Sequence, residues 1–179
     1  MGVAEWIALA ALILGLMALP TVFQMIWGRP DITFVFNRTD DQKDALLLVH
    51  LYNLPVANRA LSWMGVTRAE AHFRAAIKVN DSSGNQILRY AEPPISAGDP
   101  FKQNLIHLHA GPSPVTLEIL GANRKCARTY TEHRADSFYD YSPGTYRLRL
   151  ELWVGERMFF EERSFVVTAD FKNSYWADS

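Results

Sequence analysis

The stretch SPGTYRLRLELWVGE, residues 142–156, decides the fold class of this chain. Apolar and charged side chains alternate along it, with the apolar ones at Tyr146, Leu148, Leu150 and Leu152. Strict alternation is typical of a β-strand that has one face in the core and the other in solvent. Ser-Pro-Gly before the strand favours a turn, because proline presets φ and glycine permits a positive φ. The stretch therefore predicts a turn followed by a long, half-buried strand.

Working outward, the same two-residue period recurs on both sides. Residues 154–157 predict a hairpin turn into a strand over 158–168. On the N-terminal side, further alternating or apolar runs predict strands over 32–36, 47–53, 73–79, 86–90, 105–109 and 115–120. About seven short strands separated by turn signals are typical of an antiparallel β-sandwich. Residues 57–64 break the pattern and predict a short helix.

The run Pro143-Gly144-Thr145-Tyr146, its alternating strand and the hairpin to Phe165-Val166-Val167 resemble the last two strands of immunoglobulin-like and fibronectin-III-like domains. The resemblance implies that Tyr146 is a tyrosine-corner residue, whose hydroxyl donates to upstream backbone. The Cys…Trp…Cys set of antibody domains is absent from the sequence. A fold shared by so many activities implies no particular function.

Residues 6–28 form an uncharged apolar run. As a helix at about 1.5 Å per residue, the part from Trp6 to Trp27 is roughly 33 Å long, close to a hydrocarbon core of about 30 Å. Tryptophan at both ends suits the membrane interface. A cleaved signal peptide would have a basic n-region and a shorter apolar core, and a buried helix of a soluble protein would have a polar face. We therefore expect an uncleaved single-pass anchor that contacts the bilayer through residues 6–27.

This division gives a membrane anchor over 1–28, a β-sandwich over 29–171 and a C-terminal tail over 172–179, which is either disordered or docked on the sheet. Arg29 and Arg38 follow the anchor, whereas no Lys or Arg precedes it. The positive-inside rule then places the domain in the cytoplasm, and the single cysteine agrees. The alternative is the extracytoplasmic side, where single-anchor sandwiches often lie.

The composition limits the partners. Hydrophobic residues are 49% of the chain and charged residues 21%, which predicts a folded domain. Glu5 is the one charged residue before Arg29. All 18 Lys and Arg, and all but one of the 19 Asp and Glu, therefore lie in the portion from Arg29 onward. Because that portion is formally neutral, it lacks the basic surface that nucleic acid requires, and no nucleic-acid partner is expected. The lone thiol, Cys126, is interpreted as inert or mildly reactive.

His107-Leu108-His109 is the sharpest candidate for metal chemistry. Residues i and i+2 of a strand share a face, so both imidazoles are able to reach one ion. A third ligand would have to come from His50, His72, His133 or a nearby carboxylate. Because two histidines alone lack the ligand number of a zinc site, the sequence favours polar residues on a solvent-facing edge strand, and no cofactor is expected.

Aromatic residues supply a second candidate site. Residues 136–141 predict an acidic, aromatic loop in which Phe138, Tyr139 and Tyr141 either form a binding surface or fill the end of the sandwich. Trp153 lies on the charged face of its strand, where it is either a binding residue or packs across the hairpin on Phe159 or Phe160. Residues 46–52 are apolar on both faces, which indicates a covered central strand or a patch for a partner.

The sequence lacks Gly-x-Ser-x-Gly, a phosphate-binding glycine loop and His-Glu-x-x-His. We therefore expect no enzymatic activity. The best-supported function is that of a membrane-anchored, non-catalytic module that binds another protein. The alternatives are a ligand-binding or sensing domain, for example for a carbohydrate, and a metal-dependent enzyme built on His107 and His109.

Overall fold

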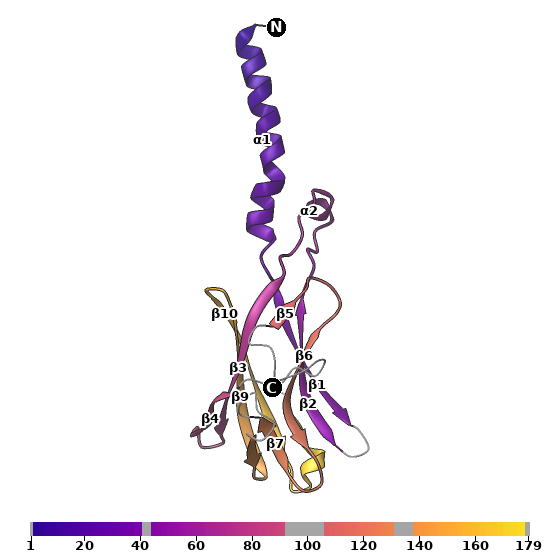
Figure 1. Ribbon diagram of the computed structural model, residues 1–179, viewed down its shortest axis with the longest axis vertical. Helices are drawn as coiled ribbons and strands as arrows, with labels where there is room; N and C mark the ends of the chain where they lie inside the picture. Colours follow the sequence, from indigo (N-terminus) through magenta and orange to yellow (C-terminus); the bar gives the residue numbers. More distant parts are fainter. Residues whose placement is uncertain (1, 41–43, 92–105, 131–137, 178–179) are drawn as a thin grey trace.

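The computed structural model describes residues 2–40, 44–91, 106–130 and 138–177. It is mainly β, with one long apolar helix, α1 (Val3–Trp27), that extends from one end of two antiparallel sheets (Figure 1). No side chain of α1 is buried among the described residues, although nearly all of its residues are apolar. It is long and apolar enough to cross a membrane.

The first sheet has five strands in the order β1-β2-β6-β7-β8. Its long hairpin pairs β1 with β2 from Ile32 opposite Asn53 to Asp40 opposite Ala45. The sheet comprises β1 (Ile32–Asp40), β2 (Ala45–Asn53), β6 (Val115–Ala122), β7 (Ala127–Tyr130) and β8 (Phe138–Tyr141).

The second sheet has the order β11-β10-β9-β3-β4, and a further strand, β5, also pairs with β3. It comprises β11 (Tyr175–Trp176), β10 (Arg157–Val167), β9 (Gly144–Val154), β3 (Ala71–Asp81), β4 (Gln86–Ala91) and β5 (Ile106–Leu108). A one-turn 3-10 helix, η1 (Phe171–Asn173), precedes β11. Strands β4 and β5 share one edge of β3, with β5 opposite its first residues and β4 opposite its last.

The core between the sheets confirms the predicted alternation. On β9, Leu148, Leu150 and Leu152 are fully buried while Arg147 is exposed. Every second residue is buried on two further strands too: Phe73, Ala75, Ile77 and Val79 on β3, and Leu47, Val49 and Leu51 on β2. The hydroxyl of Tyr146 donates to the carbonyl oxygen of Ser142 at 2.7 Å, which is the hydrogen bond that the tyrosine-corner resemblance implies.

Three expectations from the sequence are corrected by the structure. Residues 138–141 are not a loop but strand β8, which pairs with β7. Trp153 does not lie opposite Phe159 or Phe160; its cross-hairpin partner is Met158. The described residues contain eleven strands rather than about seven; β7, β8 and β11 have no predicted counterpart, because strands of two to four residues carry no two-residue pattern long enough to recognise.

The segment that the sequence leaves open as a tail partly joins the domain. Tyr175 and Trp176 pair with β10, and the indole Nε1 of Trp176 donates to the carbonyl oxygen of Asn37 at 2.8 Å. The ring of Trp176 also packs edge-on against Phe36, with centroids 4.9 Å apart. Residue 176 therefore links the open edge of the second sheet to β1 of the first.

The predicted short helix is present as α2 (Arg59–Trp63). The side chain of Asn58 caps it by accepting from the backbone N–H groups of Ala60 and Leu61. Leu61 is buried, whereas Trp63 is 92% exposed. Figure 1 shows α2 beside the end of α1 nearest the sheets, so this loop lies at the same end of the domain as the apolar helix.

Candidate functional site

The last turn of α1 is hydrogen-bonded to the segment that leads into β3. The Gln24 side chain donates from Nε2 to the carbonyl oxygen of Thr67 at 2.7 Å and accepts at Oε1 from the Thr67 N–H at 2.9 Å. The N–H of Ala69 donates to the carbonyl oxygen of Gly28 at 2.6 Å. A Cβ at position 28 would overlap the Gln24 side chain, so glycine is required for this close approach.

Arg68 completes this junction. Its Nη1 donates to the carbonyl oxygens of Trp27 at 2.7 Å and Arg29 at 2.9 Å, and its Nη2 pairs with Asp31 at 3.2 Å. The terminal carbonyls of a helix lack intrahelical partners and carry negative partial charge, so a guanidinium there is favourable. The helix end and the domain are thus joined by side chain and backbone together, rather than by the peptide linker alone.

Next to this junction, a carboxylate and three imidazoles gather on the surface of β3 and β5. Glu70 directly follows Ala69, and His72 is on β3, opposite His107 of β5. The Oε1 atom of Glu70 lies 3.3 Å from Nδ1 of His107 and 3.4 Å from Nδ1 of His109. Its Oε2 lies 4.0 Å from Nε2 of His72. The pair expected from the sequence is therefore joined by two further groups able to ligate a metal.

The other histidines lie elsewhere or outside the described residues. His50, on β2, forms a 2.8 Å hydrogen bond with the Thr116 hydroxyl and one of 3.3 Å with the Asn37 amide. His133 falls outside the described part of the chain. Of the histidines proposed from the sequence as a third ligand, His72 lies beside His107 and His109, whereas His50 lies in the first sheet.

The structure divides the aromatic candidates. Tyr141 is 3% exposed and packs edge-on against Tyr146 and Phe165, so it belongs to the core, and burial raises its pKa far above the usual tyrosine range. Tyr139 packs against Tyr141. Phe138 is exposed, with the Arg128 guanidinium 4.2 Å above its ring. Of these three aromatic residues, Phe138 is the one that is exposed, at the β8 edge of the first sheet.

Trp153 belongs to the other sheet. It is half-buried on the outer face of β9, opposite Met158 on β10 and Arg74 on β3. Met158 is 46% exposed, and Phe160, two residues further on the same face, is 50% exposed. These three side chains, Trp153, Met158 and Phe160, form an apolar patch on the outer face of the second sheet. Phe138 and Trp153 are on different sheets and do not form one aromatic groove.

A charged network borders the apolar patch. Glu151 is buried and accepts from Lys78 at 2.7 Å and from Arg149 at 2.8 Å. Arg149 also pairs with Glu162 at 3.2 Å and lies 4.3 Å above the ring of Phe160. A buried carboxylate held by two cations fixes the positions of the neighbouring side chains. The patch therefore has a polar border on the side away from α1, as protein-binding surfaces commonly do.

Of the two alternatives that the sequence left open for residues 46–52, the structure favours the covered central strand, because β2 lies between β1 and β6. Leu48 is buried and Leu46 is half-buried, so the apolar positions of β2 do not form a broad exposed patch.

On the neighbouring strand β6, burial and the Asp44 carboxylate raise the pKa of Glu118. Cys126 is half-buried and its Sγ accepts from Arg128 Nη2 at 3.0 Å, which agrees with a thiol in a structural role.

Sequence reasoning missed Glu70, Trp63 and the bond between Gln24 and Thr67. Glu70 and His107 are 37 residues apart, and only the pairing of β5 with β3 brings them together. Trp63 carried one signal, which is that a large apolar residue stands in a short helix that follows a long apolar run in the sequence.

A search of protein-family models finds no match to this chain, and no curated protein or solved structure matches it either.

Proposed function

We propose that this chain is a single-pass membrane protein whose two-sheet domain is a non-catalytic module that binds another protein beside the lipid surface. The observation that carries the proposal is the exposure of α1. It has no buried side chain among the described residues, yet its last turn is hydrogen-bonded to the domain at Thr67 and Ala69. A fully exposed apolar helix is stable only where lipid or another apolar partner covers it.

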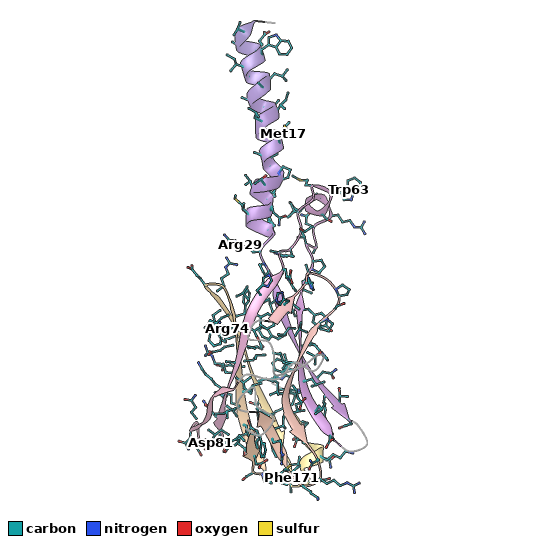
Figure 2. The ribbon with its side chains drawn as sticks, in the orientation of Figure 1. Met17, Arg29, Trp63, Arg74, Asp81 and Phe171 are labelled. Carbon is teal, nitrogen blue, oxygen red and sulfur yellow. The ribbon has the colours of Figure 1, made fainter. Side chains whose placement is uncertain are left out.

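The junction supports a fixed position of the domain against the bilayer. Because Gln24 and Arg68 hold the end of α1, the surfaces around Trp63 and Glu70 face the same side as the helix. Figure 2 places Trp63 between the levels of Met17 and Arg29 along the long axis of the molecule. At that level, a bilayer spanned by α1 would reach Trp63, whose exposed indole suits the interface.

Basic residues near the same end support this placement. Arg29 follows α1, and Arg59, exposed, begins α2. Positive side chains beside a membrane segment are attracted to anionic lipid headgroups. They also agree with the positive-inside rule, so we place the domain on the cytoplasmic side.

The partner surface that we propose is the apolar patch of Trp153, Met158 and Phe160. Aromatic and methionine side chains with a charged border are typical of the central part of a protein interface. The ligand-binding alternative is less well supported, because the aromatic residues on which it rested are divided between the two sheets.

A photocrosslinking experiment in the native membrane tests this function. A photoreactive amino acid replaces Phe160, and a matched control replaces Ser83, which is exposed in the turn at the far end of β3. We expect a discrete crosslinked product from position 160, none from position 83, and loss of the product when Trp153→Ala is added. Equal products from both positions, or none from position 160, would contradict the proposal.

The membrane side is tested with a single cysteine. Cys126 is a poor probe because its thiol is half-buried, so Ser83→Cys in a Cys126→Ser background is used instead. A membrane-impermeant maleimide should label position 83 only after the cells are lysed. Labelling of intact cells would place the domain on the extracytoplasmic side.

A further inference from the structure

We propose that Glu70, His72, His107 and His109 bind a divalent transition-metal ion of the zinc type at the membrane-proximal end of the second sheet. The proposal does not depend on the protein-binding function. It rests on the strand register, on the distances between the ligand atoms and on the chemistry of the four side chains.

The register places the four side chains on one face. Strands β3 and β5 are antiparallel, with His72 opposite His107 and Ala71 opposite Leu108. The same register, continued by one residue, places Glu70 opposite His109. Glu70 and His109 lie one residue beyond the paired strands, and because residues two apart share a face of a strand, they lie on the same surface as His72 and His107. Opposite Cβ atoms in such pairs are about 4.5–5.5 Å apart, which is close enough for two side chains to share an ion.

The distances between ligand atoms fit a small ion. Ligands bound tetrahedrally at about 2.0–2.1 Å from zinc lie roughly 3.3–3.4 Å from one another. The Glu70 Oε1 lies 3.3 Å from His107 Nδ1 and 3.4 Å from His109 Nδ1. One ligand atom each from Glu70, His72 and His107 lies within 4.8 Å of the other two. The Nε2 atom of His72 lies 4.0 Å from Oε2 of Glu70, so we expect the His72 ring to rotate toward the ion on binding.

The donor set selects the class of metal. Three imidazole nitrogens and one carboxylate oxygen suit zinc, copper or nickel, whereas calcium and magnesium prefer sites made of oxygen alone. The side chains are between 34% and 79% exposed. An ion is therefore able to enter without opening the core, and each side chain is free to adjust its rotamer.

Binding would have a structural consequence next to the membrane. Strand β5 is held to β3 by three residue pairs, and the cluster joins the two strands a second time. Glu70 adjoins Ala69, whose N–H bonds the carbonyl oxygen of Gly28 at the end of α1. An ion that binds only the folded state raises its stability in proportion to the logarithm of the ion concentration. Zinc is thus expected to stabilise the junction as well as the sheet.

The test uses the full-length chain in detergent micelles, without a polyhistidine tag and stripped of metal with a chelator. Zn²⁺ is titrated by calorimetry, and the visible absorption of Co²⁺ reports the coordination geometry. We expect one ion per chain, a tetrahedral Co²⁺ spectrum and a higher melting temperature with zinc. The triple variant His72→Ala, His107→Ala and His109→Ala should bind zinc at least roughly tenfold more weakly, as should Glu70→Gln.

The matched control is His50→Ala, which removes an imidazole from β2 outside the cluster. It should bind zinc like the unchanged chain. Circular dichroism without metal checks that each variant is folded, as expected for substitutions at exposed positions. Zinc binding that survives the triple substitution, or that falls equally in His50→Ala, overturns the proposal. The measurement is made in micelles, so failure of the membrane or protein-binding proposal would leave its outcome unchanged.

Discussion

Two hydrogen bonds, of 2.7 Å and 2.9 Å, join the side chain of Gln24 to the backbone of Thr67. They connect the last turn of α1 to the segment that enters β3. The side-chain amide of Gln24 thereby pairs with a backbone amide in the way that two strands pair with each other. Together with Arg68 and Gly28, this contact fixes the direction in which the helix leaves the domain. If α1 spans a bilayer as we propose, this contact sets how the domain lies against it.

We expect Gln24→Leu to loosen the junction while the sheets remain intact. A net hydrogen bond is worth about 0.5–1.5 kcal/mol, so the amides of Thr67 and Ala69 should exchange with deuterium roughly tenfold faster. Hydrogen-exchange mass spectrometry of the chain in micelles measures this. Gln86→Leu, at an exposed position of β4, is the control. Unchanged exchange in Gln24→Leu would show that the contact is not formed.

Gly28→Ala should affect the same amides by a different route. A methyl group at position 28 would overlap both the side chain and the carbonyl of Gln24, so the residue has to shift away from Thr67. Gly15→Ala is the matched control, because a Cβ at position 15 has no atom within 4 Å. Faster exchange at Thr67 in the first variant and not in the second is the expected result, and equal exchange in both would contradict the role of Gly28.

Trp63 should contact lipid. We expect an environment-sensitive fluorophore on Trp63→Cys, in a Cys126→Ser background, to emit at shorter wavelength in anionic vesicles and to be quenched by lipids that carry a quencher in the acyl chain. The same fluorophore on Ser83→Cys should report water, since that turn lies at the opposite end of the domain (Figure 1). If both positions report water while α1 remains inserted, the loop is not at the bilayer.

Tyr146→Phe should destabilise the domain by about 0.5–1.5 kcal/mol, because it removes the hydrogen bond to Ser142 and leaves the ring packing in place. Thermal unfolding followed by near-ultraviolet circular dichroism measures the change. Tyr175→Phe alters an exposed hydroxyl and serves as the control. A melting temperature equal to that of the unchanged chain would show that the corner contributes nothing to stability.

Glu118 should make the stability of the domain depend on pH. Burial and the Asp44 carboxylate raise its pKa above the usual range of a glutamate, so the folded state favours the protonated carboxyl. The stability that this carboxyl contributes is therefore greatest below the pKa that it has in the unfolded chain, and is lost as the pH rises through the raised pKa. We expect Glu118→Gln to melt at a higher temperature than the unchanged chain at pH 7 and at the same temperature at pH 4. Glu156→Gln, in the exposed turn after β9, should show no such difference.

Local sequence determined the elements whose pattern is long and regular. The alternation over residues 144–154 fixed β9 and its inward leucines, because a strand with one face in the core needs an apolar residue at every second position. The uncharged run fixed α1 for a similar reason, since its length and composition match one helix across a bilayer. The resemblance of residues 143–146 to the tyrosine corner of immunoglobulin-like domains implied that the Tyr146 hydroxyl donates to upstream backbone, and the structure shows that bond to Ser142.

Only the tertiary structure decided which distant residues meet. Strand β8 has four residues, too few for a periodic pattern, and its existence depends on pairing with β7. The pairing of β5 with β3 brings Glu70 and His72 to His107 and His109, and the fold of residues 59–69 brings Thr67 to Gln24. A local pattern specifies which face of an element is buried. The register between elements is set by packing across the whole chain, so no window of sequence contains it.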